Sequence, residues 1–217
     1  MGQVQAFIFD LDGVITDTSE FHYRSWSRLA EEIGVPFSRE ENEKLRGVSR
    51  RESLQILLKG QVISEDAATV LTNRKNAYYL EMVDSLTPAD VLPGVLDLLA
   101  ELKRSGIRAA IASSSKNAGL VIDKLRIKPY FRVIVDGLAV TKSKPAPDLF
   151  LRAAEEMKLA AESCVVVEDA DAGIQAGKAA GMRTVGLGPV ARVGAADVVL
   201  PDLKLIRLTD LLRELQE

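Results

Sequence analysis

Short apolar runs alternate with amphipathic stretches over most of this chain, and this alternation restricts the possible folds more than any other feature. The apolar runs carry β-branched or aromatic residues and mostly lack polar alternation, which is typical of strands buried on both faces of a parallel sheet. They are residues 6–9, 107–112, 133–135, 164–167, 184–187 and 198–200. The amphipathic stretches, which we predict to be helices, are residues 95–105, 117–125, 147–157 and 171–180. Strands that alternate with helices predict a doubly wound α/β fold with a mainly parallel, Rossmann-like sheet.

One long segment interrupts the alternation. Residues from about 19 to 85 contain no convincing strand, only helical patterns separated at residues 34–36, Gly47 and Gly60. About 65 helical residues between the first and second strands are too many for a simple crossover connection. We therefore predict an inserted all-helical cap domain that lies over the sheet.

The insertion divides the chain into two predicted domains. Two linkers must join them, near residues 16–18 and near residues 86–90, and Thr18 or Ser19 is expected to cap the first helix of the cap. The predicted core domain comprises residues 1–17 and 86–217, and the predicted cap domain comprises residues 18–85.

Composition excludes several classes of function. The chain has 217 residues, 47% of them hydrophobic and 27% charged, and a formal net charge of −3, so a general basic field for nucleic acid is absent. A small phosphorylated ligand needs only a few local cations, so the net charge of the chain is compatible with binding one. The single cysteine, Cys164, cannot form an internal disulfide, residues 1–9 show no targeting signal, and no uncharged apolar run approaches the roughly 20 residues of a membrane span. We expect a cytoplasmic protein without nucleic-acid or membrane partners.

Polar side chains collect where the predicted strands end. In an open α/β sheet, ligands bind at the carboxyl ends of the strands. Carboxylates that converge there repel one another and are costly to desolvate, and a hard cation such as Mg²⁺, which normally brings phosphate with it, removes that cost. Any single aspartate could be a turn residue or a helix cap, but the whole set favours a magnesium and phosphate site. The set comprises Asp10, Asp12, Ser113, Ser114, Ser115, Lys116, Asn117, Lys144, Glu168 and Asp169.

These residues form motifs that resemble those of the haloacid dehalogenase superfamily, specifically its phosphotransferases. The first motif is Asp-Leu-Asp-Gly-Val-Ile-Thr-Asp-Thr at residues 10–18. The other three follow in the same order and at approximately the same spacing: the hydroxyl after the second strand, Lys144-Pro145, and Glu168-Asp169. The resemblance covers essentially the whole chain.

The resemblance implies a role for each carboxylate. Asp10 is the implied nucleophile, which accepts phosphate to form an aspartyl phosphate, and it is also an implied Mg²⁺ ligand. Asp12 is the implied general acid/base, with its backbone carbonyl on the metal. Glu168 and Asp169 would complete the magnesium site.

Three further residues receive roles in catalysis from the same resemblance. Lys144 should contact the transferring phosphate and Asp10, although a solvated surface lysine is the alternative. Ser113 corresponds to the hydroxyl that binds the phosphate. His22, the only histidine, resembles a residue that positions Asp12, whereas on an isolated helix a structural role would be the usual interpretation.

Segments of the cap, of the two linkers and of the loop after the second strand resemble the sugar phosphomutases of that superfamily. The matching segments are residues 16–18, 21–26, 45–50, 74–76, 88–94 and 112–117. The resemblance implies interconversion of β-glucose 1-phosphate and glucose 6-phosphate through bound β-glucose 1,6-bisphosphate. The implied substrate-binding residues are Trp26, Gly47, Val48, Arg50, Ser53, Lys75, Ser114, Ser115, Lys116 and Asn117.

Several alternatives stay open at this point. Trp26 could be an ordinary core residue, and Arg46, Arg50 and Arg51 could be the solvated start of a helix. Whether Arg46 contacts the substrate is open. A sugar-phosphate phosphatase of the same superfamily shares the core motifs, and a non-catalytic phosphosugar-binding protein is a third possibility. The partners implied are small-molecule sugar phosphates, and we expect a monomer.

Overall fold

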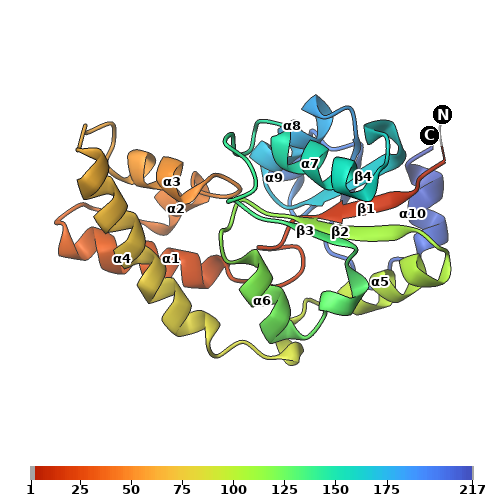
Figure 1. Cartoon of the computed structure of the whole chain (residues 1–217), viewed down its shortest axis with the longest axis horizontal. Coiled ribbons are helices and arrows are strands. Elements are labelled where there is room, and N and C mark those ends of the chain that lie inside the picture. Colours follow the sequence, from red (N-terminus) through yellow and green to blue (C-terminus); the bar gives the residue numbers. More distant parts are fainter. Residues whose placement is uncertain (1–2, 217) are drawn as a thin grey trace.

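A six-stranded parallel sheet forms the centre of the core, with the strand order β3-β2-β1-β4-β5-β6 (Figure 1). The computed structural model describes residues 3–216. In the sheet register, Phe9 lies opposite Ile111 on one side and Val167 on the other, so that β1 is central. The predicted doubly wound α/β fold with a mainly parallel sheet is confirmed. The strands are β1 Ala6–Phe9, β2 Arg108–Ala112, β3 Val133–Val135, β4 Cys164–Glu168, β5 Arg183–Leu187 and β6 Val198–Leu200.

Helices cover both faces of the sheet (Figure 1). Successive side chains of β1 point to opposite faces: Phe7 and Phe9 pack with the first group of helices, and Ile8 packs with the second. Each large apolar side chain buried in this way contributes about 1.5–3 kcal/mol relative to an exposed one. The first group is α5 Val95–Arg104, α6 Ala118–Leu125 and α10 Leu208–Glu214, and the second is α7 Asp148–Met157 and α8 Asp171–Ala179.

Short helical turns complete the core. They lie in the connections between the longer elements, where they direct the chain from one face or edge of the sheet to the next. These are the 3₁₀ turns η1 Pro88–Asp90, η2 Lys128–Tyr130 and η3 Ala161–Ser163, and the short helix α9 Val190–Val193. Among them, η1 follows the cap and α9 follows β5, so that both lie near the carboxyl ends of the strands.

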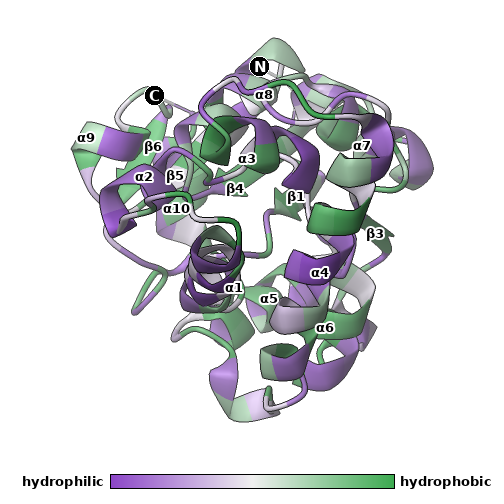
Figure 2. Ribbon diagram, turned by 90° about the vertical axis from the view of Figure 1, so that its left-hand side faces the viewer, coloured by the Kyte–Doolittle hydropathy of each residue, from purple (hydrophilic) through white to green (hydrophobic). Residues whose placement is uncertain are grey.

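A separate helical unit lies beyond the carboxyl ends of the strands (Figure 1). It has an apolar cluster of its own, which includes Trp26, Leu29 and Leu54. Seen from the cap side, α1 carries mainly hydrophilic residues on its ribbon (Figure 2). Its buried apolar residues belong to the apolar cluster of the cap. The inserted all-helical cap is therefore present, and its helices are α1 Ser19–Glu32, α2 Arg39–Glu43, α3 Arg50–Leu57 and α4 Glu65–Val83.

Capping boxes define where two of the short cap helices begin. Ser38 accepts a hydrogen bond from the backbone of Glu41, whose side chain returns to the backbone of Ser38. Ser49 and Glu52 form the same arrangement at the start of α3. Such reciprocal bonds satisfy backbone donors that a helix start otherwise leaves unpaired. They fix the loop between α2 and α3, which faces the core.

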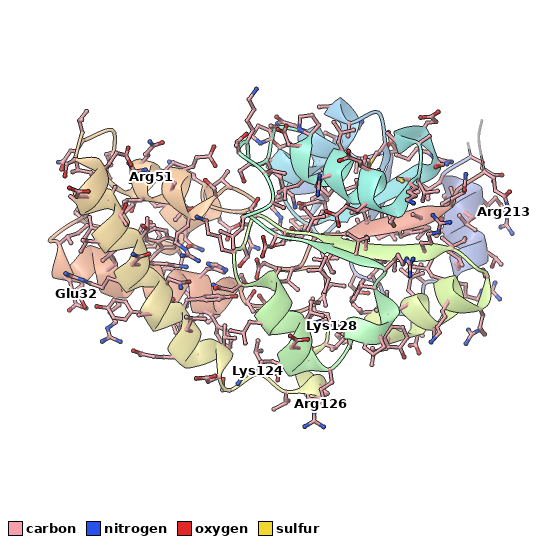
Figure 3. The ribbon with its side chains drawn as sticks, viewed as in Figure 1. Glu32, Arg51, Lys124, Arg126, Lys128 and Arg213 are labelled. Carbon is pink, nitrogen blue, oxygen red and sulfur yellow. The ribbon has the colours of Figure 1, made fainter. Side chains whose placement is uncertain are left out.

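The longest described helix, α4, extends from the far end of the cap to the second linker and has 19 residues. Its outer side chains contact α1: Tyr78 Oη donates to Glu32 at 2.7 Å. Glu32 lies at the outer end of the cap, away from the sheet (Figure 3). Its inner side chains Lys75 and Tyr79 are buried toward the core. Over residues 3–216, none of the helices is both long and apolar enough to cross a membrane.

The two linkers run side by side. Thr16 Oγ1 donates to the carbonyl of Asp90 at 2.8 Å, and the amide of Leu92 donates to the carbonyl of Ile15 at 2.9 Å. Thr18 occupies the N-cap position of α1, as expected, but the side-chain bond of a helix cap is absent. Thr18 makes no cap bond because its hydroxyl donates to Asp12, and the amide of Ser19 donates to Asp17 Oδ1 at 3.1 Å instead. The linker is thereby joined directly to an expected catalytic residue.

Candidate active site

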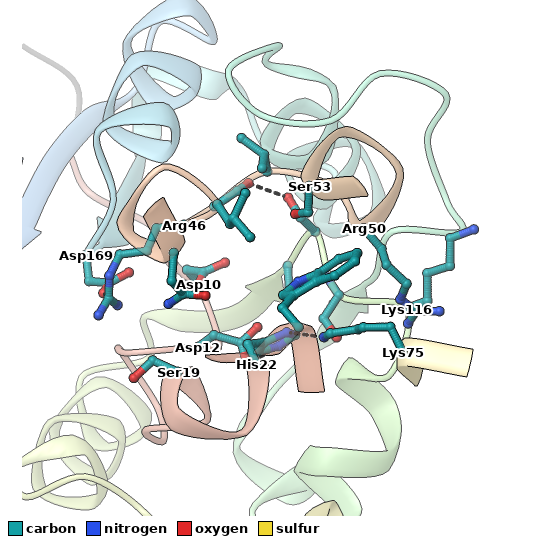
Figure 4. Close-up of a pocket in the computed structure, with 18 residues that line it drawn as sticks. Asp10, Asp12, Ser19, His22, Arg46, Arg50, Ser53, Lys75, Lys116 and Asp169 are labelled. Atoms are coloured by element: carbon teal, nitrogen blue, oxygen red, sulfur yellow. Dashed lines mark hydrogen bonds and ion pairs between the residues drawn. The ribbon is translucent and has the colours of Figure 1, made fainter. Parts of the chain in front are cut away.

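A cleft of about 750 Å³ lies between the cap and the carboxyl ends of the strands (Figure 4). Most of the residues expected to form a site contribute to its walls. Those from the core are Asp10, Asp12, Ser113, Ser114, Ser115, Lys116 and Asp169, and those from the cap are His22, Trp26, Gly47, Val48, Arg50, Ser53 and Lys75.

Three carboxylates converge on the core side of the cleft. Asp10, Glu168 and Asp169 each offer an oxygen within 4.8 Å of the others, and none is more than 5% exposed. They meet because β1 and β4 are neighbours and end at the same level. Gly13 leaves the space that Asp169 occupies, since a Cβ there would overlap the Asp169 carboxylate. Buried oxygen donors in this arrangement fit a hard cation such as Mg²⁺.

Lys144 lies beneath the floor of the cleft and neutralises part of this charge. Its Nζ donates to Asp10 Oδ1 at 2.6 Å, to Glu168 Oε1 at 2.7 Å and to the carbonyl of Ala112 at 3.0 Å. The side chain is fully buried, so a solvated surface lysine is excluded. Burial by itself would lower the pKa of Lys144, but the two carboxylates outweigh burial and raise it.

The pKa of Asp10 lies well above its usual value. Burial is the largest cause, and the charge of Lys144 opposes it only in part. A second cation beside this carboxylate would therefore favour its ionised form, which is the nucleophilic form.

Asp12 is surrounded by polar groups from the linker and the cap. Its Oδ1 accepts a hydrogen bond from Thr18 and lies 3.7 Å from His22 Nε2. Burial raises the pKa of Asp12, but His22 and Thr18 outweigh that effect, so that the pKa lies below its usual value. Among residues 3–216, the buried His22 Nε2 atom has no hydrogen-bond partner, and the Asp12 carboxylate lies just beyond hydrogen-bond distance of it.

Lys75 determines which nitrogen of His22 carries the proton. Lys75 Nζ lies 2.8 Å from His22 Nδ1. In its ammonium form Lys75 has only donors, so that Nδ1 then accepts and Nε2 carries the hydrogen that faces Asp12. Burial and the neighbouring Lys75 lower the pKa of His22, which disfavours a second proton on the ring.

A second group of cations lines the cleft away from the carboxylates (Figure 4). Lys75 is 1% exposed and has the rings of Trp26 and Tyr79 within 5.2 and 4.9 Å, and burial lowers its pKa well below its usual value. Arg50 is half-buried, and among residues 3–216 no carboxylate pairs with it. Unpaired cations in a half-buried wall suit an anionic ligand.

Direct contacts join the cap to the core across the cleft. Ser114 Oγ donates to the carbonyl of Gly47 at 2.8 Å and accepts from Ser143 Oγ at 3.0 Å. On the opposite side, Asn117 Nδ2 donates to Asn76 Oδ1 at 2.9 Å. Ser114 and Asn117 therefore hold the cap in the observed position.

Three of the expected site residues do not line the cleft. Lys144 and Glu168 lie directly below its floor, and Asn117 contacts the cap instead. The sequence analysis missed Ser19, Asn42 and Leu45, which do line it, and left Arg46 open. The spacing of residues 42, 45 and 46 could have grouped these three in one wall of the site, because they share one face of a helical turn.

A buried lysine between two carboxylates, an aspartate two residues beyond one of them, and a helical cap define an α/β phosphoryl-transfer enzyme. The chain belongs to the haloacid dehalogenase-like hydrolase family, whose model matches residues 7–187. It is 44% identical over 205 residues to the β-phosphoglucomutase of Bacillus subtilis strain 168, covering 91% of this chain and 89% of that protein.

Two further relatives bear on the two enzymatic alternatives. The crystal structure of a β-phosphoglucomutase from Clostridium difficile matches with a TM-score of 0.95 at 35% identity, covering 99% of this chain and 98% of that one. A phosphorylated carbohydrates phosphatase of Thermotoga maritima is 30% identical over 184 residues, covering 84% of each chain. The mutase is therefore favoured over the phosphatase.

Proposed function

We propose that this enzyme is a β-phosphoglucomutase, which interconverts β-D-glucose 1-phosphate and D-glucose 6-phosphate through a phosphoaspartate and β-glucose 1,6-bisphosphate. The observation that carries the proposal is that one cleft has two different anion-binding ends. Asp10 and the other carboxylates lie at one end, and Arg50 and Lys75, with which no carboxylate of residues 3–216 forms an ion pair, lie at the other. A sugar bisphosphate has one phosphate for each end.

In the proposed reaction, Asp10 Oδ attacks a phosphorus atom of the bisphosphate, and the bond from that phosphorus to the sugar oxygen breaks. Asp12 donates its proton to the departing sugar oxygen. When that phosphorus is the one on C1, glucose 6-phosphate leaves. The C6 hydroxyl of an incoming β-glucose 1-phosphate then attacks the phosphoaspartate, the bond from Asp10 to phosphorus breaks, and Asp12 takes the hydroxyl proton. Asp10 and the bisphosphate are both regenerated, so that one β-glucose 1-phosphate has become one glucose 6-phosphate.

Magnesium is the proposed cofactor. Asp10, Glu168, Asp169 and the backbone carbonyl of Asp12 would hold it, and it would neutralise charge on the transferring phosphoryl group. Lys144 would add a second positive charge beside Asp10, and Ser113 would donate a hydrogen bond to the same phosphate. Glu168, the second carboxylate that accepts a hydrogen bond from Lys144, fixes the position of the ammonium group.

The cap accounts for transfer to a sugar rather than to water. Arg50, together with Ser115, Lys116 and Asn117, would bind the phosphate that is not transferred and hold the cap shut. Closure would hold His22 beside Asp12, where it already lies 3.7 Å away, and so maintain the acid/base arrangement. Water provides no such binding energy, so the phosphoaspartate survives until a sugar phosphate arrives.

Replacing Arg50 with Ala should lower mutase turnover by about 10²-fold or more while leaving hydrolysis of the phosphoaspartate within about threefold of its wild-type rate. Both rates are measured on the same preparation, turnover by glucose 6-phosphate formation and hydrolysis by phosphate release. Arg51→Ala is the matched control, because Arg51 lies one residue further on and pairs with exposed Glu65 at 2.7 Å. Equal loss of both activities in Arg50→Ala would contradict cap closure by the distal phosphate.

The proposed activity is tested with β-glucose 1-phosphate, Mg²⁺ and a trace of β-glucose 1,6-bisphosphate. We expect glucose 6-phosphate to form rapidly, with little free phosphate and no reaction of the α-anomer. Phosphate release without isomerisation would identify the phosphatase instead. No reaction of either kind would favour a phosphosugar-binding protein, against which the complete set of Asp10, Asp12 and Lys144 argues. We further propose a monomer, because the core and the cap of this chain together supply both walls of the cleft. We also propose a cytoplasmic location, as expected from the sequence.

A further inference from the structure

Arg46 reaches across the cleft from the cap to the candidate metal site (Figure 4). It follows helix α2, and its Nη1 donates to Asp169 Oδ2 at 3.0 Å. The Asp169 side chain is 7% exposed and that of Arg46 is 23% exposed, so this ion pair is largely shielded from water. The same guanidinium donates through Nε to Glu43 Oε2 at 2.8 Å.

A second guanidinium, from the core, approaches the same aspartate. Arg192 Nε donates to the main-chain carbonyl of Asp169 at 2.6 Å, and its Nη1 lies 3.8 Å from Glu43 Oε2. Glu43 and Arg46 belong to the cap, whereas Asp169 and Arg192 belong to the core. The four residues form one charged network that joins the two parts of the molecule at the carboxylate cluster.

Arg46 and a metal ion would both use the Asp169 carboxylate. Magnesium requires close approach to carboxylate oxygens, at about 2.0–2.1 Å, and tolerates little distortion. A guanidinium hydrogen-bonded to Asp169 Oδ2 would place another positive charge next to that ion and would occupy part of its coordination space. Glu43 can keep its bond to Arg46 when the cap moves, because both lie on the same short segment.

We propose that Arg46 competes with the magnesium ion for Asp169, so that cap closure over the metal-free site and metal binding oppose each other. This inference rests on the magnesium site of the proposed function. The Arg46–Asp169 ion pair holds the cap on the core while the site lacks metal, and metal binding displaces Arg46. The coupling is reciprocal: whatever closes the cap through Arg46 weakens metal binding by the same factor.

The test is a calorimetric titration of the full chain with Mg²⁺ in the absence of any sugar phosphate. Arg46→Gln should bind Mg²⁺ about fivefold more tightly or better, the lower end of typical coupling between sites. Arg46→Lys keeps the charge and should stay within about twofold of wild type. Arg51→Gln is the matched control, since it removes a cap arginine that pairs with Glu65 and lies outside the network.

A second readout follows the cap itself. Trp26 is the only tryptophan, and it lies in the cap and lines the cleft, so its emission reports cap position. Adding Mg²⁺ should shift the emission of the wild-type chain, and Arg46→Gln should start near the shifted value and change little. Equal Mg²⁺ affinity in wild type and Arg46→Gln would overturn the proposed competition but would leave the proposed metal site standing. Failure of both proteins to bind Mg²⁺ would overturn the proposed metal site and this inference with it.

Discussion

Replacing Asp10 with Asn should lower the rate of phosphoryl transfer by at least about 10⁴-fold, the usual scale for loss of a nucleophile. The carboxamide has nearly the same shape, so the buried environment is preserved, but its oxygen is not a nucleophile. The substitution also removes one charge from the carboxylate cluster, whereas Lys144 keeps its second partner, Glu168. The loss should therefore be in kcat rather than in folding.

Rapid-quench incorporation of labelled phosphate from the sugar bisphosphate into the protein measures this step directly. We expect labelled wild-type protein and no detectable label on Asp10→Asn. The matched control is Asp66→Asn, which alters an exposed carboxylate at the start of α4 and should label normally. A transfer rate within tenfold of wild type in Asp10→Asn would show that another group accepts the phosphate.

Replacing Lys144 with Met should lower the free energy of unfolding by about 3–5 kcal/mol at pH 7, because removing one partner of a buried ion pair leaves uncompensated charge. Asp10 and Glu168 would both lose their shared cation in a region that is nearly inaccessible to water. Lys144 lowers the pKa of Asp10, which burial already raises, so the variant should raise it further. A group whose pKa is raised by folding binds a proton more readily in the folded state. The stability deficit should therefore shrink as the pH falls from 7 toward 5.

Urea unfolding of both proteins at several pH values measures this difference. Lys142→Met is the matched control, because Lys142 is exposed in the same loop and its loss should cost less than about 0.5 kcal/mol. Equal stability of Lys144→Met and wild type at pH 7 would contradict the role of the buried lysine. A deficit that stays constant with pH would contradict its electrostatic origin.

The strands could be predicted from the sequence because burial on both faces leaves continuous apolar runs. Each of the six predicted runs lies within one residue of a strand at either end. The remaining differences depend on backbone pairing rather than on side chains. β2 begins at Arg108 rather than at residue 107, because Arg108 is the residue that pairs with Ala6. β5 begins at Arg183, one residue early, and β4 ends at Glu168, one residue late, because these two residues pair with the neighbouring strand.

The positions of the site residues could be predicted to a similar extent, but their contacts could not. Sequence motifs placed Asp10, Lys144 and Glu168 at one edge of the sheet, whereas the fully buried lysine between two carboxylates is seen only in the structure. The contacts of Ser114 with Gly47 and of Arg46 with Asp169 depend on where the cap lies relative to the core. No local pattern encodes that relation, because the partners are far apart in the sequence.

The central claim is that Asp10 passes its phosphate to a sugar phosphate in preference to water. The most direct measurement is the fate of the phosphoenzyme, labelled from radioactive glucose 1,6-bisphosphate and then mixed with either buffer or unlabelled glucose 6-phosphate. The account predicts slow loss of label to free phosphate in buffer, and loss at least about 10²-fold faster with sugar phosphate, with the label recovered in the bisphosphate. Equal rates of loss, with the label in free phosphate under both conditions, would contradict it.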